Sequence, residues 1–397
     1  MREVSACDRF AMLGRDYHSV EDIIDGRVVE PTPPAWCEGR GLTDYLLGLS
    51  DDALLRMEMH GVQRDDAVPA ALADIARMVR RELGGWPQLA AVARPVEAPG
   101  ASVRKRTQVA AFVEQVVRGL PRATRIVDFG AGLGHLTHAL QSTLRIATLG
   151  LEHDGRRVVR ARESVLSGAQ FDVRDASAEQ SLESGDLAVG LHACGDLGDS
   201  LLRQAVRASA HVMLVSCCLQ KVRSRVRPAL SSTGRHVALS FSHVALSLSN
   251  LSNWRDPAKL LDIHRSRETR QALRQLLIHR GVALQPGEET HGVHRRKFKR
   301  GLPMAAPLAC RHRDLTAPSD EEVRHFEGLA RREYAVLRRL SLPRILLGRL
   351  VECAVVLDRA AYLEEHGYRV RTHALVPSDV TPRNLTIVAA AGSGGRG

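Results

Sequence analysis

The sequence predicts an α/β fold: a mostly parallel sheet covered by helices on both faces, with a helical lobe before it and a helical insertion within it. Three observations predict this fold. An apolar stretch at 125–129 runs directly into glycines at 130, 132 and 134, a turn typical of ligand-binding parallel sheets. Strand-like apolar runs alternate with helical patterns from 125 to 218, which indicates βαβ units. Residues 1–100 and 258–340 instead show helical periodicity.

Composition limits the class of protein. The 397 residues are 44% hydrophobic and 25% charged, which is the balance of a folded protein rather than a disordered one. The length allows two domains, or one α/β domain with a large extension. The net charge of +11 comes mainly from arginine. A basic balance favours anionic partners such as nucleic acid, with an Arg-rich solvated surface as the alternative.

Cysteine usage predicts the compartment. Seven cysteines, an odd number, lie at positions without a recurring spacing, so we expect no disulfide framework and a reducing cytoplasm. The N-terminus lacks an apolar signal segment, and no run of about 18 apolar residues occurs. We therefore expect a cytoplasmic protein that does not enter a membrane. The sequence does not indicate an oligomeric state.

Residues 1–100 predict an N-terminal helical region. Apolar stripes follow Leu42, Leu54 and Leu72 at helical spacing, with Ser50 as a cap and Gly84 as an end. Residues 101–219 predict the first part of the sheet, entered through an amphipathic helix at 105–117. Lys105 and Gln108 on this helix either face the ligand pocket or form a solvated helix start.

The glycine turn carries the first site motif. Asp128 precedes Gly130, Gly132 and Gly134 in the pattern D-x-G-x-G-x-G, which differs from the dinucleotide fingerprint by its leading acid. It resembles motif I of the Rossmann-like S-adenosylmethionine-dependent methyltransferases. The resemblance implies that the glycine backbone packs on the methionine part of the cofactor, and that Asp128 orients the loop and the cofactor's ammonium. A glycine turn without a cofactor is the alternative.

Two further acids end the next strands. Glu152 closes the strand at 145–152, about 20 residues after the turn, where ribose hydroxyls are bound in such folds. Asp175 and Ala176 end the short strand at 169–176. In the methyltransferase pattern an acid there accepts from the adenine amino group, and the next N–H meets the ring. Asp172 is the alternative acid.

A cluster of reactive residues follows the fourth and fifth strands, at 186–196 and 210–218. Parallel topology places them near the cofactor. The spacing is not that of common zinc sites, and the dipeptide of cysteine-nucleophile methyltransferases is absent, so we predict neither a metal centre nor a thiolate nucleophile. His192 suits a base or substrate contact because its ordinary pKa lies near neutrality. The cluster comprises His192, Cys194, Asp196, Cys217 and Cys218.

The rest of the chain predicts a helical and basic insertion at 220–342 and the end of the sheet at 343–391, before a flexible tail at 392–397. The basic run at 294–300 can meet phosphates with Phe298 stacking on a base, or form a solvated face. Strands at 368–376 and 384–390 form a C-terminal pair, whose joining loop brings Arg383 and Asn384 to the active face.

These elements together resemble the family of methyltransferase-like protein 25. The family also includes the protein named for a ribosomal RNA adenine dimethylase domain, and a related domain occurs in a glutathione-transferase-C-terminal-containing protein. The resemblance covers about residues 100–390 and implies a seven-stranded Rossmann-like methyltransferase fold with a C-terminal antiparallel hairpin. The family has Ser in place of Thr381 and an aromatic residue in place of Leu219. The resemblance is based on residues 190–197, on Cys217-Cys218 with Lys221, and on residues 351–359 and 381–384.

We therefore predict methyl transfer from S-adenosylmethionine to an unidentified acceptor, with RNA or a ribosomal or other protein favoured. His192, Asp196 and Asn384 are the predicted catalytic contacts, and Arg383 and Lys221 the predicted substrate contacts. The tetrapeptide of adenine-N6 enzymes is absent, so base dimethylation is not supported. The alternatives are a non-catalytic RNA- or ribosome-binding module on a methyltransferase scaffold, and a different nucleotide-binding enzyme such as a dehydrogenase.

Overall fold

The computed structural model describes residues 4–88, 96–164, 170–172, 182–249, 256–285 and 287–392. The chain forms two compact units. The sheet unit comprises Met1–Asp25, Arg77–Ser252 and Leu347–Gly397. The helical unit comprises Gly26–Ala76 and Asn253–Leu346.

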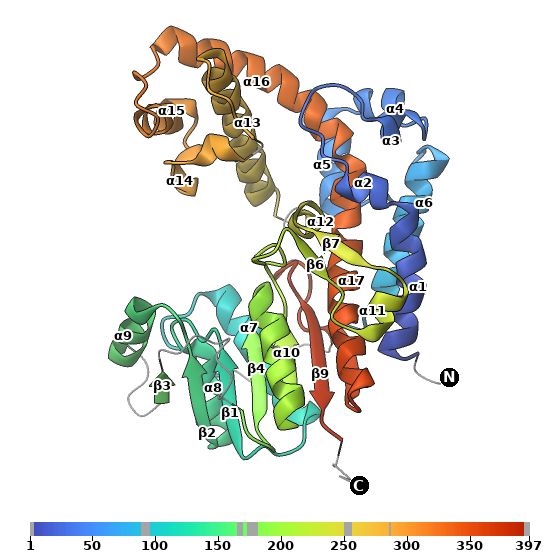
Figure 1. The fold of residues 1–397 in the computed structure, drawn as a ribbon, viewed down its shortest axis with the longest axis vertical. Coiled ribbons are helices and arrows are strands. Elements are labelled where there is room, and N and C mark those ends of the chain that lie inside the picture. Colours follow the sequence, from blue (N-terminus) through green and yellow to red (C-terminus); the bar gives the residue numbers. More distant parts are fainter. Residues whose placement is uncertain are drawn as a thin grey trace. The chain divides into compact units, whose positions relative to one another are not determined.

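A seven-stranded sheet forms the centre of the sheet unit, in the order β3-β2-β1-β4-β5-β9-β8 (Figure 1). Strands β1 to β5 are mutually parallel, and β9 is antiparallel to both β5 and β8. The predicted mostly parallel sheet with a C-terminal antiparallel hairpin is confirmed. Its strands are β1 Arg125–Phe129, β2 Ala147–Leu151, β3 Gln170–Asp172, β4 Leu187–Leu191, β5 His211–Val215, β8 Arg369–Ala374 and β9 Leu385–Ala390.

Strand direction decides which loops share an edge. Because β9 opposes both of its neighbours, β8 runs in the same direction as β5. The loop that follows Ala374 therefore lies at the same edge as the carboxyl ends of β1, β4 and β5, as predicted from the sequence.

Helices cover both faces of the sheet. Apolar residues of α7 (Val103–Gly119) and α8 (His135–Leu144) share a core with Ile126, Val189 and Met213. On the other face, a Cβ at Gly190 would lie 3.2 Å from Leu201 of α10 (Asp196–Ala208). Glycine at this position lets α10 approach β4 closely. The unit also contains α1 Ala6–Ser19, α2 Glu21–Asp25, α9 Gly155–Ser164 and most residues of α17 Leu342–Glu365.

Residues 220–252 belong to the sheet unit, which corrects the expected boundary at residue 219. Strand β6 (Val226–Pro228) pairs antiparallel with β7 (Ser240–Ser242), and α11 (Ser232–His236) and α12 (His243–Leu248) accompany them. The physical reason is an ionic anchor: Arg227 of β6 is bound to Asp199 of α10 and Asp358 of α17, both at 2.8 Å. The mixed polar and apolar pattern of residues 240–253 predicts neither β7 nor α12.

The helical unit has a core of its own, formed by α13 (Pro257–His279), α15 (Leu302–Arg311) and α16 (Asp320–Leu340). Helix α13 begins at the cap Asp256 with proline at its first position, and Ser319 and Glu322 form a capping box on α16. The unit also contains α3 Ala35–Glu38, α4 Thr43–Leu47, α5 Asp51–His60, part of α6 Ala70–Gly84, the 3₁₀ turn Glu288–Thr290 and α14 Arg295–Phe298.

Phe298 corrects one sequence prediction. Its side chain is only 2% exposed and packs in the core of the helical unit, so it does not stack on a base. Its neighbours Arg295, Arg296, Lys299 and Arg300 remain exposed. No helix in the described part of the chain is long and apolar enough to cross a bilayer.

Candidate active site

The glycine turn wraps over the end of β2. Gly130, Gly132 and Gly134 have φ values of 75°, 65° and 80°, a region that L side chains rarely adopt. The N–H groups of Gly130 and Ala131 both donate to the Leu151 carbonyl, at 2.9 and 3.0 Å. At Gly132, a Cβ would meet only the Gly130 carbonyl, at 4.0 Å. The turn therefore leaves open space beside its central glycine.

Glu152 lies against this turn. The side chain is 2% exposed, and its Oε2 accepts from the Gly132 N–H at 2.9 Å while its Oε1 accepts from the Asp154 N–H at 3.0 Å. Oε1 also lies 3.1 Å from the His153 Nδ1, so Oε2 is the oxygen with a second lone pair that can accept from a ligand hydroxyl. The structure thus places Glu152 beside the glycine turn, as expected.

Asp128 is buried beneath the turn. Its Oδ2 accepts from the Thr137 hydroxyl of α8 at 2.8 Å, so it holds the start of the helix that follows the glycines. Burial raises the pKa of Asp128 to about 6, and the Thr137 hydrogen bond and the nearby Lys105 oppose that rise. Asp128 therefore orients the loop through Thr137, a residue that the sequence reasoning did not single out.

Helix α7 supplies two side chains to the same region. Burial lowers the pKa of Lys105, and its ammonium interacts with the charges of both Asp128 and Cys217. The Gln108 Oε1 lies 3.0 Å from the His192 Nε2. The Gln108 Nε2 is buried without a hydrogen-bond partner in the described part of the chain, which marks a donor available to a ligand. Of the two alternatives for this helix start, the structure supports the pocket-facing one.

His192 follows β4 in a strained conformation, with a φ of 79°. Such outliers cluster at functional sites. Burial, followed by the positive charges of Lys105 and Arg104, lowers the pKa of His192 to about 4. This corrects the expectation of an ordinary histidine pKa: at neutral pH His192 is a neutral imidazole.

Three thiols meet where β4 and β5 end. The register pairs Leu191 with Val215, so the residues just beyond these two positions lie side by side. The Cys217 Sγ lies 2.7 Å from that of Cys194 and 3.7 Å from that of Cys218, and all three cysteines are free thiols. We name Cys194, Cys217 and Cys218 the thiol cluster. The thiols of Cys194 and Cys217, followed by Lys221, lower the pKa of Cys218.

The predicted substrate contacts Arg383 and Lys221 and the predicted catalytic contact Asn384 lie in two different settings. The positive charge of Arg383 lowers the pKa of both Cys218 and His192. The positive charge of Lys221 also lowers the pKa of Cys218. Asn384 is 4% exposed, and its Oδ1 accepts from Arg349 at 2.6 Å while its Nδ2 donates to the Val376 carbonyl at 2.7 Å. This corrects the expected role of Asn384, because its amide holds the loop instead of facing an acceptor.

Asp196 has a similar positioning role. Its Oδ2 accepts from the Arg223 N–H at 2.8 Å, and its N–H donates to the Lys221 carbonyl at 3.2 Å. The same carbonyl lies only 1.7 Å from a Cβ built on Gly195, so only glycine fits there. Asp196 thus positions the segment that carries Lys221. Asp175 and Ala176, predicted to contact adenine, lie outside the described residues.

Sequence reasoning missed a buried network of two arginines and two aspartates behind the thiol cluster. Arg359 is fully buried, and it donates to Asp199 at 2.7 Å, to the Ser216 hydroxyl at 2.5 Å and to the Gly195 carbonyl at 2.8 Å. Asp358 accepts from Arg227 and from the backbone of residues 230 and 231. We name Asp199, Arg227, Asp358 and Arg359 the arginine–aspartate cluster. Arg359 fixes the residues immediately before Asp196 and Cys217.

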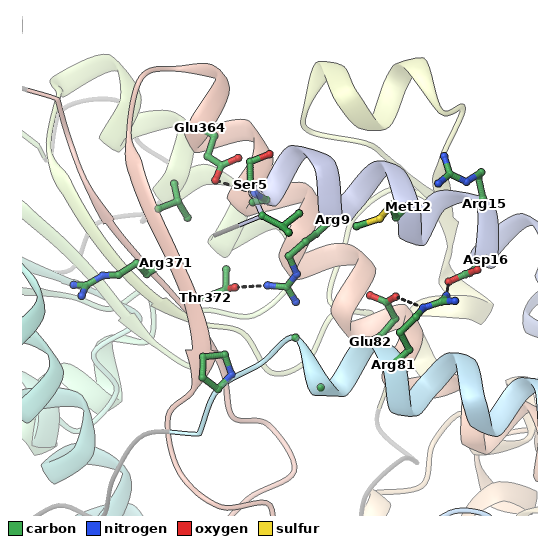
Figure 2. A pocket seen from close by; sticks show the side chains of 16 residues that line it. Ser5, Arg9, Met12, Arg15, Asp16, Arg81, Glu82, Glu364, Arg371 and Thr372 are labelled. Carbon is green, nitrogen blue, oxygen red and sulfur yellow. Dashed lines mark hydrogen bonds and ion pairs between the residues drawn. The ribbon is translucent and has the colours of Figure 1, made fainter. Parts of the chain in front are cut away.

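A cavity of about 970 Å³ lies elsewhere in the sheet unit, between α1, α6 and β8 (Figure 2). Arg9 donates to Thr372 at 2.8 Å, and Arg81 pairs with Asp16 and Glu82. Residues 370–372 lie within β8 and before its last two residues, away from the carboxyl edge that carries the glycine turn. None of the predicted site residues lines this cavity, so the size of a cavity does not identify the active site here.

The chain matches a protein family described as a methyltransferase domain over residues 104–225. This range contains the glycine turn, Glu152, His192, the thiol cluster and Lys221. The match names a methyltransferase domain and no finer family, so the assignment to the family of methyltransferase-like protein 25 stays a prediction.

Curated relatives carry the name glutathione S-transferase C-terminal domain-containing protein. A homolog from Drosophila pseudoobscura pseudoobscura is 32% identical over 120 residues, which are 29% of this chain and 20% of the relative. The protein from Bos taurus is 23% identical over 314 residues, or 76% of this chain and 36% of the relative. The chain thus spans about a fifth to about a third of these relatives. The predicted occurrence of a related domain in such a protein is confirmed.

Among solved structures, the chain is similar to a TehB-like SAM-dependent methyltransferase from Corynebacterium glutamicum, with 21% identity and a TM-score of 0.23. The similarity covers 26% of this chain and 60% of that protein, and at this TM-score it adds nothing to the fold described above. The cofactor is judged on the site itself: positive-φ glycines beside open space, a buried carboxylate and an unpaired amide donor all suit an adenosyl ligand with a cationic amino-acid end. The family match and this site together identify residues 104–225 as a methyltransferase domain and support S-adenosylmethionine as its cofactor.

Proposed function

We propose that this chain catalyses methyl transfer from S-adenosylmethionine to RNA. One observation carries the catalytic part of the proposal: Glu152 is buried against the open glycine turn through the Gly132 N–H, at the carboxyl edge of the sheet. The cofactor supplies an electrophilic methyl group on a sulfonium. The protein then has to orient an acceptor and exclude water, and positioning of this kind is worth several kcal/mol.

The residues that follow β4 and β5 would contact the methyl acceptor. At neutral pH His192 is uncharged, since burial has lowered its pKa to about 4, so it offers an acceptor or donor nitrogen rather than a cation. Lys221 and Arg383 add positive charge close to Cys218. Neutral and cationic groups together suit an acceptor attached to a phosphate backbone.

Charge distribution favours RNA as the acceptor. Residues 253–346 contain 20 Lys and Arg against 11 Asp and Glu, although the whole chain has 56 against 45. This segment supplies most of the net charge of +11. Such a concentration of positive charge attracts a polyanion independently of sequence.

The test is transfer of a labelled methyl group. The full chain is incubated with cell lysate and S-adenosylmethionine labelled on its methyl carbon, and the products are divided between nuclease and protease treatment. We expect nuclease-sensitive label that disappears with Glu152→Ala. Label that only protease removes would identify a protein acceptor instead. Calorimetry with S-adenosylhomocysteine and NAD tests the cofactor separately, and binding of NAD alone would contradict the whole proposal.

A second candidate is a non-catalytic module that binds RNA or a ribosomal surface. It is favoured by one segment, residues 253–346, in which Lys and Arg outnumber Asp and Glu by 20 to 11; all of this segment belongs to the helical unit and not to the sheet unit that holds the site. RNA binding that falls with increasing salt, together with binding of S-adenosylhomocysteine but no transfer of label, would select this candidate.

A further inference from the structure

We propose that Cys194, Cys217 and Cys218 bind one thiophilic metal ion, for which Zn²⁺ is the natural probe, and leave one coordination position open at the carboxyl edge of the sheet. The proposal does not depend on methyl transfer, and it concerns residues to which the sequence assigned no metal.

The geometry of the thiol cluster supports a shared ion. Its three sulfur atoms all lie within 4.8 Å of one another. Tetrahedral zinc with Zn–S bonds of about 2.3 Å separates its sulfur ligands by about 3.8 Å. The Cys217 and Cys218 sulfurs already have this separation, at 3.7 Å, whereas Cys194 and Cys217, at 2.7 Å, would have to move apart by about 1 Å.

The spacing of the three cysteines in the sequence does not reveal that they converge. Cys194 follows β4 by three residues and Cys217 follows β5 by two, and the parallel pairing of Leu191 with Val215 brings them together. The ligands therefore come from two strands rather than from one C-x₂-C turn. The site is also supported from behind, because Arg359 holds the Gly195 carbonyl and the Ser216 hydroxyl, which are next to Cys194 and Cys217 in the chain.

The charges around the cluster suit thiolate ligands. Lys105 interacts with Cys217, and Lys221 and Arg383 interact with Cys218. Binding of the ion releases the protons that the cluster sulfurs still carry and gives a complex of Zn²⁺ with three thiolates, which has a net charge of −1. The neighbouring cations offset that charge. A cluster of neutral thiols would gain nothing from three cations around it.

The fourth position has no protein ligand among the described residues. No His, Asp or Glu of the described part of the chain joins the three sulfurs, and the His192 Nε2 is engaged by Gln108 instead. Three protein ligands with one open position is the pattern of zinc sites that bind a water or a substrate group rather than of purely structural ones.

A disulfide between Cys194 and Cys217 is the competing explanation. It would use two sulfurs and leave the convergence of Cys218 unexplained.

Metal content tests the proposal without any methyl donor. The full chain is loaded with Zn²⁺ under reducing conditions, dialysed against a weak chelator and analysed for zinc and for free thiols. We expect about one zinc per chain. Loss of a partner outside the ligand shell already costs about 10- to 100-fold in affinity, so Cys194→Ser, Cys217→Ser and Cys218→Ser should each weaken binding by at least that factor.

Cys7→Ser is the matched control, because Cys7 is half-buried like Cys194 and Cys218 but lies in α1, away from the cluster. It should retain the metal. If a cluster variant fails to fold, alkylation of the wild-type chain decides: Zn²⁺ should slow alkylation of the three cluster cysteines and leave the alkylation rate of Cys7 unchanged. Any of three results would overturn the proposal. The wild type could retain no more zinc than Cys218→Ser, or the cluster cysteines could be alkylated equally with and without zinc. A Cys194–Cys217 disulfide could also persist under those reducing conditions.

Discussion

The two ends of the site are held in opposite ways. At the ends of β1 and β2, carboxylates accept: Glu152 binds the Gly132 N–H and Asp128 binds the Thr137 hydroxyl. At the ends of β4 and β5, a buried cation donates: Arg359 binds the Gly195 carbonyl and the Ser216 hydroxyl. We name Asp128 and Glu152 the carboxylate pair, in contrast to the thiol cluster.

The contrast shows what each end of the site suits. A negative, amide-lined turn stabilises a ligand with positive charge, such as a sulfonium or an ammonium. The thiol cluster has Lys105, Lys221 and Arg383 nearby and so stabilises negative charge, whether on thiolates or on an acceptor. Lys105 of α7 interacts with Asp128 at one end and with Cys217 at the other, and Gln108 of the same helix contacts His192. One helix therefore couples two regions of opposite charge.

The largest expected effect comes from the arginine–aspartate cluster behind the thiols. Asp199→Asn keeps the shape of the side chain but removes the carboxylate that pairs with both Arg359 and Arg227. Arg359 is then left buried with only neutral partners. Breaking a buried pair in this way costs about 3–5 kcal/mol, which urea unfolding of the full chain would measure.

Glu183→Gln is the control for this change. Glu183 is 81% exposed and lies 3.6 Å from Arg125, so its loss should change the free energy of unfolding by no more than about 0.5 kcal/mol. If Asp199→Asn cost no more than this control, the buried cluster would not be what holds the second end of the site.

The two ends also differ in how far the sequence predicted them. The glycine turn and Glu152 follow from local spacing, because one strand, one turn and the next strand end fix their positions. The seven-stranded sheet with its final hairpin is what the family resemblance implies, and the place of Arg383 follows from the direction of the strand before its loop. Convergence of Cys194 with Cys217 depends on the β4–β5 register, which spacing does not reveal. The role of Asn384 and the burial of Phe298 depend on tertiary contacts with Arg349 and with α15 and α16, which a linear pattern cannot show.

The pH dependence of stability tests the carboxylate pair. Burial raises the pKa of Asp128 to about 6, above its unfolded value of about 4. Between these values the folded chain binds the extra proton, so stability is fully present below about pH 4 and falls as the pH rises to about 6. The wild type should lose up to about 3 kcal/mol relative to Asp128→Asn over this window. Urea unfolding of both proteins at several pH values measures it. A difference that stays constant, or grows in the opposite direction, would show that Asp128 is charged in the folded state.

The smallest expected effect is on the affinity for S-adenosylhomocysteine. This measurement distinguishes the carboxylate pair from the thiol cluster most directly. Glu152→Gln keeps the size of the side chain, but its amide nitrogen can no longer accept from one of the two N–H groups that Glu152 binds. Hydrogen bonds to charged groups are worth about 1.5–3 kcal/mol, so the affinity for S-adenosylhomocysteine should fall by at least about 10-fold in calorimetry. Cys218→Ser, which changes only the thiol cluster, should leave that affinity within about 2-fold, because a sulfur-to-oxygen change away from the glycine turn alters no predicted contact of this ligand. Equal losses in both variants would mean that the carboxylate pair and the thiol cluster bind the same ligand, and that the division of the site by charge is wrong.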